Sequence, residues 1–155
     1  MTDHELHAFR DKFQLDALTV METEHWVLSV RPQQLTLGSM ILSTRTNVLN
    51  FASLNETQAR DMAILLGEAE QRVKARWGAV RINALCLMMK DPLLHFHIFP
   101  RYENAVIFQG EEWIDADWPN PPQIRPATER ADINQSLRAA LQPPIGNDPI
   151  TQSPG

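Results

Sequence analysis

The sequence predicts an α+β fold in which an antiparallel sheet of about five strands packs on one long helix. Three observations support this prediction. Short apolar and β-branched runs alternate with turn residues, one apolar stripe continues at helical spacing over residues 59–77, and the connections between these segments are short. The chain has 155 residues and 43% hydrophobic content, which is enough for one domain with its own core.

The elements can be assigned along the chain from periodicity and turn residues. A short amphipathic helix is predicted over residues 5–13. Gly38, near the start of the third strand, has no side chain and would allow a neighbouring segment to approach closely. The predicted strands cover residues 18–21, 26–30, 37–44, 80–89 and 93–102.

The long helix has clear start and stop signals. Asn55 is a candidate N-cap, and Gln58 three residues later completes a capping box. Gly78 is the expected C-terminal stop. The apolar positions that should face the core are Ala59, Met62, Ala63, Leu66, Ala69, Val73 and Trp77.

The last third of the chain has a different character. Residues 113–126 combine Trp113 and Trp118 with prolines and charges, so we expect an irregular extension, beginning near residue 103, that wraps the domain surface. The alternative is a lid or dimer arm over a ligand site. A second helix is predicted over 127–141. The domain is then 1–141, and residues 142–155 form a disordered tail.

Two histidines at alternating positions are the main chemical signal. His95 and His97 lie in an otherwise apolar run, and alternate residues of a strand face the same side. Phe96 and Ile98 should then point into the opposite, core-facing layer. A single strand histidine is most often structural, but two imidazoles on one face, followed by Pro-Arg, favour a functional site.

The run LLHFHIFPRY at 93–102 resembles the signature of the histidine-triad (HIT) family of nucleotide hydrolases and transferases. Aligned on the Pro-Arg pair, His97 takes the third triad position, His95 the middle one and Leu93 the first. The resemblance covers about residues 15–102 and implies a HIT-like fold. Two departures are Leu93 itself and Ser39, which follows Gly38 where the family usually has histidine.

The resemblance implies cleavage of a phosphoanhydride or phosphoramidate bond of a nucleotide, without metal or other cofactor. His95 would attack the α-phosphate and form a covalent nucleotidyl-histidine, which splits one hard substitution into two easier ones. The main-chain carbonyl of Leu93 would orient His95, so the missing first side chain need not abolish attack. His97 would hold a phosphate oxygen or assist the leaving group. The family usually forms homodimers, so a homodimer is expected.

Further candidate substrate-binding residues follow from the same alignment. Asn83 and Lys90 stand near positions that touch phosphate, and Arg31 where the family contacts ribose. Arg101 could contact phosphate or pair with Glu103 or Asp91. Ser39 could donate one hydrogen bond but cannot carry a proton at neutral pH. The alternative interpretation is that these side chains are only solvated or form ion pairs, without a role in binding.

Two other classes of protein remain open. The first is a non-catalytic nucleotide-binding or sensor module with an eroded triad, favoured by Leu93 and Ser39. The second is a cupin-like metalloprotein built on His-x-His, for which a third clustered ligand is lacking. Cys86, the single cysteine, lies in an apolar run, where a buried and inert thiol is expected.

Charge and hydropathy limit partners and location. The net charge of -5 argues against a general grip on nucleic acid, although a small anion could bind where positive groups converge. The N-terminus lacks a signal-peptide core, and no apolar run is long enough to span a membrane. We therefore expect a cytoplasmic protein with no membrane partner and a small-molecule nucleotide substrate.

Overall fold

The computed structural model describes residues 3–144 and contains one five-stranded sheet. Its strand order is β1-β2-β3-β5-β4, and every neighbouring pair is antiparallel. The strands are β1 (Thr19–Glu22), β2 (Trp26–Val30), β3 (Met40–Thr44), β4 (Arg81–Leu85) and β5 (His95–Arg101). The predicted α+β fold is confirmed.

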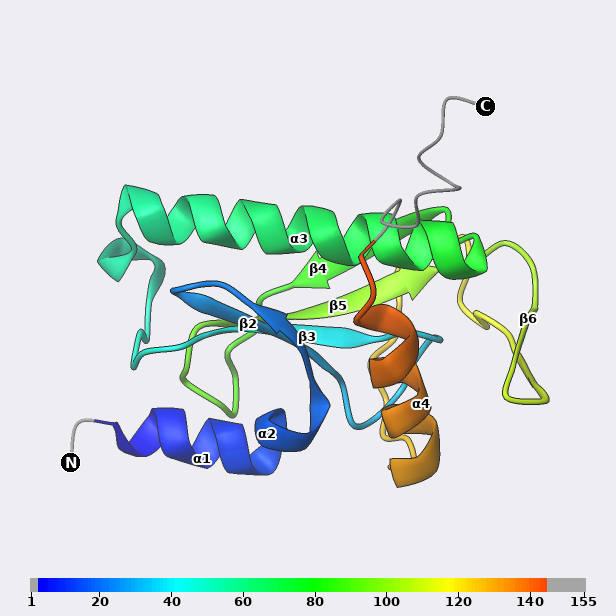
Figure 1. Ribbon diagram of the computed structural model, residues 1–155, viewed down its shortest axis with the longest axis horizontal. Helices are drawn as coiled ribbons and strands as arrows, with labels where there is room; N and C mark the ends of the chain where they lie inside the picture. The colour runs from blue at the N-terminus through cyan, green and yellow to red at the C-terminus, as the bar shows by residue number, and fades with distance from the viewer. Residues whose placement is uncertain (1–2, 145–155) are drawn as a thin grey trace.

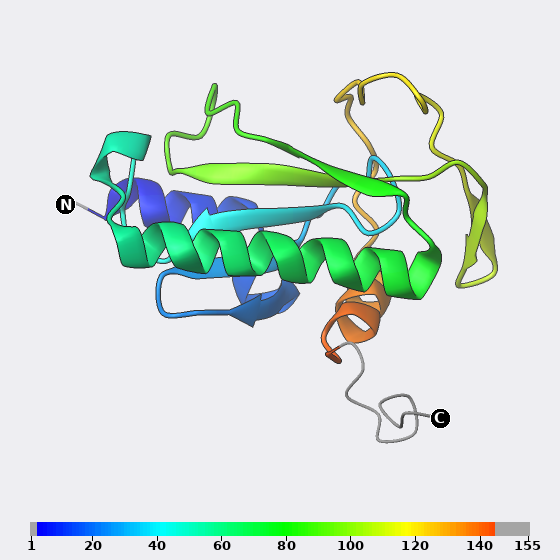
Figure 2. The same ribbon diagram turned by 90° about the horizontal axis from the view of Figure 1, so that it is seen from above.

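Helices cover both faces of this sheet. The long helix α3 lies along one face, while α1 and α2 lie on the other (Figure 1; Figure 2). All residues of β2 and β3 are buried as a result. The helices are α1 (His4–Lys12), α2 (Leu15–Leu18), the 3-10 turn η1 (Phe51–Ser53), α3 (Glu56–Trp77) and α4 (Ala131–Leu141).

The predicted signals at both ends of α3 are confirmed. The Asn55 side chain accepts a hydrogen bond from the Gln58 N–H, and the Gln58 side chain accepts one from the Asn55 N–H, both at 2.9 Å. Gly78 ends the helix in the left-handed region at φ 73°. The predicted apolar stripe was wrong at its first turns, because the buried stripe runs through Leu65, Ala69 and Val73. Ala59 and Ala63 consequently lie on the exposed side.

The prediction of the N-terminal strand started one residue too early, because β1 begins at Thr19. Gln14 adopts a left-handed conformation that separates α1 from α2, and Leu18 belongs to α2 rather than to β1. Leu15 and Leu18 are both buried, so their apolar character serves helix packing. Gly38 has φ 84°, and a Cβ there would lie 2.8 Å from the Trp77 ring. The predicted close approach at Gly38 is confirmed.

The two strands around the histidines are shorter than predicted. β4 ends at Leu85, so residues 86–89 belong to the loop, where Met88 has φ 51°. Leu93 and Leu94 are buried but precede β5. Apolar character extended both predictions, because Leu93 and Leu94 pack in the interior just before β5, whereas the apolar residues Leu87 and Met89 are exposed in the loop.

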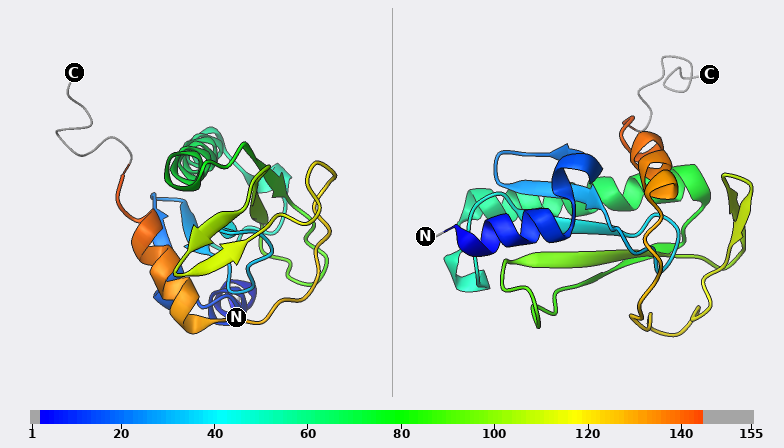
Figure 3. Two further views of the ribbon diagram at one scale, coloured as in Figure 1. Left: turned by 90° about the vertical axis from the view of Figure 1, so that its right-hand side faces the viewer. Right: turned by 90° about the horizontal axis from the view of Figure 1, so that it is seen from below.

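The C-terminal extension contains a hairpin that we did not predict. β6 (Val106–Phe108) and β7 (Glu111–Trp113) pair antiparallel, and Gln109 and Gly110 form the two-residue turn with positive φ. Residues 114–130 are irregular, as expected for most of this stretch. They pass from the hairpin to α4 on the side of the sheet that carries α1 (Figure 3).

The chain after this extension is more ordered than predicted up to residue 144. α4 begins at Ala131 instead of residue 127. The buried Arg72 donates hydrogen bonds to the carbonyls of Leu141, Gln142 and Pro143. The start of the predicted disordered tail is therefore held against α3, and residues 145–155 lie outside the described part of the chain. None of the helices in residues 3–144 combines the length and apolar character that crossing a bilayer requires.

Candidate active site

The two histidines of β5 share the face of the sheet that lies opposite α3. In the strand register His95 faces Ser43, and His97 lies between Ile41 and Leu85. Their ring centroids are 5.0 Å apart. Ile98 lies in the core cluster on the other face, and Phe96 packs against that cluster. Strand alternation therefore puts both imidazoles on one side, as predicted.

His95 is held by the backbone just before its own strand. Its Nδ1 lies 2.6 Å from the carbonyl oxygen of Leu93, which can only accept, so Nδ1 carries the proton and Nε2 keeps its lone pair. The side chain is 2% exposed, with the Phe9 ring 4.8 Å away, yet it lines a cavity. Burial lowers the pKa of His95, although the hydrogen bond to Leu93 opposes the shift. The ring is therefore neutral at pH 7.

His97 is held by a side chain from another strand. Arg31, directly after β2, donates from Nε to His97 Nδ1 at 3.1 Å. The proton of His97 must then be on Nε2. Burial lowers the pKa of His97 to about 3, helped by the Arg31 guanidinium. His97 is thus a neutral hydrogen-bond donor at every pH near neutrality.

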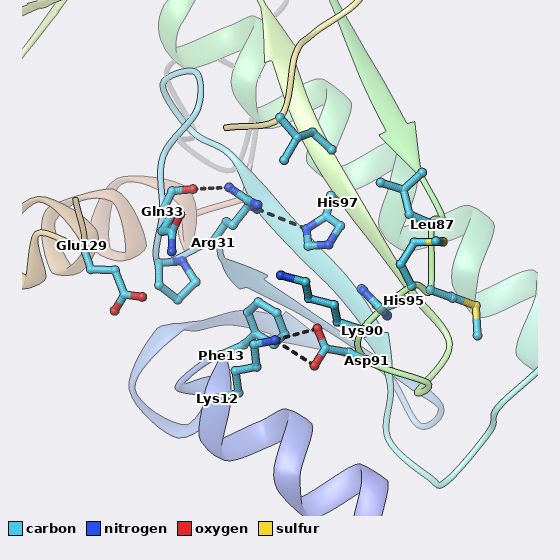
Figure 4. Close-up of a pocket in the computed structure, with 14 residues that line it drawn as sticks. Lys12, Phe13, Arg31, Gln33, Leu87, Lys90, Asp91, His95, His97 and Glu129 are labelled. Atoms are coloured by element: carbon cyan, nitrogen blue, oxygen red, sulfur yellow. Dashed lines mark hydrogen bonds and ion pairs between the residues drawn. The ribbon is translucent and has the colours of Figure 1, made fainter. Parts of the chain in front are cut away.

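Both histidines line a cavity of about 360 Å³ (Figure 4). Its walls come from five parts of the chain. These are Lys12 and Phe13 at the end of α1, Arg31 and Gln33 after β2, residues 87–91 in the β4–β5 loop, His95 and His97 on β5, and Ile124 and Glu129 in the extension.

Positive charge gathers in this cavity. Arg31 is 8% exposed, and no carboxylate among residues 3–144 forms an ion pair with it. The Lys90 ammonium points into the cavity and forms no ion pair within the same residues (Figure 4). Lys12 is neutralised by Asp91, whose two oxygens each lie 2.9 Å from Nζ. Glu129 also lines the cavity, and its carboxylate accepts a hydrogen bond from Gln14 at 2.9 Å. An anion bound beside the histidines would meet the cations of Arg31 and Lys90.

The structure separates Asn83 and Arg101 from the histidine cavity. Asn83 Oδ1 accepts a hydrogen bond from Arg101 Nη1 at 2.7 Å, and both residues line a second, shallower depression beside Trp118. Arg101 pairs with Asp115, at 2.7 Å from Nε to Oδ2, so the expected pairing with Glu103 or Asp91 was wrong. Asp115 was missed because it lies in the irregular extension.

Ser39 is also placed away from the cavity. Its hydroxyl donates to the Thr36 carbonyl at 2.7 Å and accepts from the Thr36 N–H, which closes the turn before β3. The side chain is fully buried. Ser39 is therefore occupied within its own turn, whereas Arg31 supplies the polar neighbour of His97.

Sequence reasoning missed several parts of the cavity. Lys12 is the last residue of α1 and Phe13 caps that helix, a segment for which only amphipathic periodicity was seen, and Ile124 lies in the irregular extension. Their only sequence signal was their residue type. Leu87, Met88 and Met89 were assigned to a buried strand, but Leu87 and Met89 are exposed at 50% and 85%. Leu87, Met88 and Met89 form an apolar part of the cavity wall beside the histidines.

Residues 3–144 do not contain the geometry for a cysteine nucleophile or for a metal site. Cys86 is half-buried in the loop after β4, and burial raises the pKa of its thiol. It is therefore protonated at neutral pH and a poor nucleophile. No group of three or more histidine, cysteine, aspartate or glutamate side chains in this range could hold a metal ion.

Comparison with known proteins identifies the fold. No protein-family model matches the sequence, and no curated protein matches it either. Among solved structures, the chain is similar to a histidine triad protein from Marinobacter aquaeolei, with TM-score 0.67 and 19% identity, covering 86% of this chain and 91% of that one. A histidine triad protein from Bradyrhizobium japonicum gives TM-score 0.63 and 19% identity over 81% of this chain and 87% of that one.

A third structure carries a description of its ligand class. It is a hypothetical histidine triad nucleotide-binding protein from Sulfolobus tokodaii, with TM-score 0.60 and 16% identity, covering 81% of this chain and 80% of that one. The resemblance seen in residues 93–102 thus extends to the whole arrangement of the sheet and α3. The chain has the histidine-triad fold.

Proposed function

We propose that this protein cleaves a phosphoanhydride or phosphoramidate bond of a nucleotide through a covalent nucleotidyl-histidine on His95. The observation that carries the proposal is the Leu93 carbonyl, which fixes the proton of His95 on Nδ1 and leaves the Nε2 lone pair available in a cavity. This contact exists although the first triad side chain is leucine. The histidine-triad fold supports the same chemistry.

The reaction can be written with this chain's own groups. His95 Nε2 attacks the α-phosphorus, the P–O or P–N bond to the leaving group breaks, and the leaving group takes a proton from solvent. The Nδ1–H bond to Leu93 stabilises the positive charge that develops on the ring. Water then attacks the same phosphorus, the P–N bond to His95 breaks, and the nucleoside monophosphate leaves. No step requires a metal.

The low pKa of His97 favours one of its two expected roles. A group with a pKa of about 3 carries no spare proton at pH 7, so it is unsuited to protonate a leaving group. Its Nε2–H can instead donate to a non-bridging phosphate oxygen. Arg31 uses Nε and Nη1 for His97 and the Gln33 carbonyl, and its remaining N–H groups would bind the same phosphate.

The remaining candidates are assigned by position. Lys90 would supply charge to the phosphate chain from the mouth of the cavity. Asn83, Ser39 and Arg101 are more distant, and their hydrogen bonds support a structural role in this state. We also infer a homodimer, because β4 is an edge strand of the sheet and its outer side is unpaired within residues 3–144.

A non-catalytic nucleotide-binding module is the second candidate. Phe9 and Phe13 lie 4.8 and 6.4 Å from the His95 ring, which is 2% exposed, and this cover favours a site that binds but does not turn over. Leu93 is packed in an apolar cluster with Leu6 and Ile41, so it provides no proton relay. Binding alone would still use Arg31, Lys90 and His97.

A trapping experiment separates the two functions. Wild type is incubated with adenosine and guanosine phosphoramidates and dinucleoside polyphosphates, quenched in alkali, and analysed by mass spectrometry for a nucleotidyl adduct on His95. His95→Ala should lower turnover by about 10⁴-fold or more while weakening nucleoside monophosphate binding only modestly. His7→Ala removes an exposed histidine from α1 and should behave as wild type. Equal residual turnover in wild type and His95→Ala, with nucleotide bound by both, would establish the binding module instead.

A further inference from the structure

Arg31 and His97 are fixed on the same aromatic side chain. The Arg31 guanidinium carbon lies 5.2 Å from the centre of the Phe99 ring, and the His97 ring stacks on Phe99 at 6.2 Å with an interplanar angle of 6°. Arg31 Nη1 donates to the Gln33 carbonyl at 2.7 Å, which holds the guanidinium from its other side. Arg31 therefore has little freedom to turn away from His97 Nδ1.

The support for Arg31 reaches the C-terminal extension. The Gln33 side chain accepts a hydrogen bond from the Ala127 N–H at 3.0 Å, and the Gln34 side chain donates to the Arg31 carbonyl at 2.8 Å. The residues that hold Arg31 are thus tied to the chain segment leading to α4. A contact supported on this many sides is suited to fixing one geometry.

We propose that Arg31 is a positioning residue, which locks His97 in the tautomer with Nδ1 as acceptor and Nε2–H free to hold the substrate's phosphate oxygen. An arginine N–H can only donate, so the alternative tautomer would put two hydrogens against each other. The inference deepens the proposed function and rests on it for the catalytic consequence. The tautomer itself can be measured without substrate.

The other charged groups around His97 act in the same direction, with one exception. Besides Arg31, His97 faces His95 on β5, Lys12 from α1 and Asp91 from the β4–β5 loop. Burial and the positive groups favour the neutral ring, and Asp91 alone favours the charged one. Lys90 and Glu129 also line the cavity, and they carry opposite charges. A neutral, singly protonated His97 is therefore expected over the whole neutral range.

Histidine tautomers give distinct nitrogen shifts, so NMR provides a direct test. The intact chain is labelled with ¹⁵N-histidine, and long-range ¹H–¹⁵N correlations are recorded from about pH 8 to about pH 5, around the usual histidine pKa. His97 is assigned by comparison with His97→Gln. Wild type should show His97 as the Nε2–H tautomer at every pH, without protonation. In Arg31→Met, His97 should show a mixture of tautomers and begin to titrate within this range.

Two controls keep the result specific. Arg45→Met removes an exposed arginine next to Glu22 and should leave the His97 signals unchanged, although the net charge changes equally. Arg31→Lys retains a cation and a donor, and should restore the Nε2–H tautomer in part. It also tests the contact should Arg31→Met not fold. An Nδ1–H tautomer in wild type, or an unchanged His97 spectrum in the folded Arg31→Met variant, would overturn the inference, as would an Nδ1–H tautomer in Arg31→Lys.

Turnover provides a second, separable readout. With a nucleoside phosphoramidate that wild type cleaves, Arg31→Met should lower kcat by about tenfold to a hundredfold, as expected for misplacing a catalytic group. Its activity should also acquire an additional dependence on acidic pH, which Arg45→Met lacks. If wild type cleaves none of the substrates but the NMR result holds, the proposed function fails and the assignment of Arg31 stands. If wild type cleaves a substrate but the NMR result fails, the proposed function stands and the assignment of Arg31 fails.

Discussion

Arg31 and Arg101 are two buried arginines on the same face of the sheet, and they have opposite surroundings. Arg101 makes four hydrogen bonds, two of them to the Asp115 carboxylate and the others to Asn83 and the Asn120 carbonyl. Arg31 makes two, both to neutral acceptors on His97 and Gln33. Within residues 3–144, the charge of Arg101 is compensated by a carboxylate and the charge of Arg31 is not.

The difference indicates which arginine is structural and which can bind a ligand. A buried charge without a counter-ion destabilises a fold, so it persists where a ligand supplies the missing charge or where function requires it. Burial alone lowers the pKa of Arg31, and no carboxylate opposes this effect. Arg101 fastens the extension to β5 through Asp115. Arg31, beside the two histidines, is the arginine that an anionic substrate would neutralise.

The largest effect is expected from breaking the compensated pair. Asp115→Ala leaves Arg101 buried without its partner, which should lower the free energy of unfolding by about 3–5 kcal/mol, as measured by urea denaturation. The double variant Arg101→Met with Asp115→Leu should recover most of this loss, because an apolar pair can replace a buried ion pair. Asp16→Ala removes an exposed partner of Arg10 and should cost less than about 1 kcal/mol. An Asp115→Ala variant as stable as Asp16→Ala would contradict the structural role.

The uncompensated arginine should show the opposite pattern. Arg31→Met loses two hydrogen bonds but also removes an unpaired buried charge, so the free energy of unfolding should change by no more than about 1 kcal/mol. Binding of a nucleoside monophosphate should weaken by about 2 kcal/mol, the value of a hydrogen bond to a charged group. Calorimetric titration measures this, with Arg45→Met as the charge-matched control. Unchanged affinity in Arg31→Met, or a stability loss as large as that of Asp115→Ala, would remove the distinction between the two arginines.

Local sequence rules predicted the elements whose signals lie within a few residues of each other. The capping box at Asn55 and Gln58 and the stop at Gly78 were of this kind, as was the alternation that puts His95 and His97 on one face. The hairpin at 106–113 had a local signal too, because Gln109-Gly110 directly follows the apolar run 106–108. It was missed because glutamine is not among the usual first residues of such turns.

Contacts between distant segments could not be predicted in the same way. Arg31 meets His97 across 66 residues, and Lys12 meets Asp91 across 79. From the sequence, Arg101 follows Pro100 in the motif and was a candidate for phosphate, while Arg31 was assigned to ribose only by alignment. Which of the two has a carboxylate partner depends on where the irregular extension passes, and composition does not determine its path. The structure was needed to distinguish them.

A smaller effect should separate the two arginines by pH. The pKa of His97 is about 3 in the folded chain and about 6.5 when unfolded, so between these values the unfolded state binds a proton that the native state does not. Stability from His97 is therefore fully present above about pH 6.5 and falls with decreasing pH through this window, by about 1.4 kcal/mol per pH unit.

His97→Gln keeps an acceptor for Arg31 but cannot be protonated. The difference in unfolding free energy between wild type and His97→Gln, measured in urea at about pH 7, 6 and 5, should shrink by that amount per unit on the acid side. Lowered carboxyl pKa values elsewhere, as at Asp117, affect both proteins equally and cancel in the difference. No histidine takes part in the pair of Arg101 and Asp115. The decrease in unfolding free energy caused by Asp115→Ala should therefore be the same at all three pH values. A wild-type stability that declined in parallel with His97→Gln would mean that His97 titrates normally, and that Arg31 does not hold it neutral.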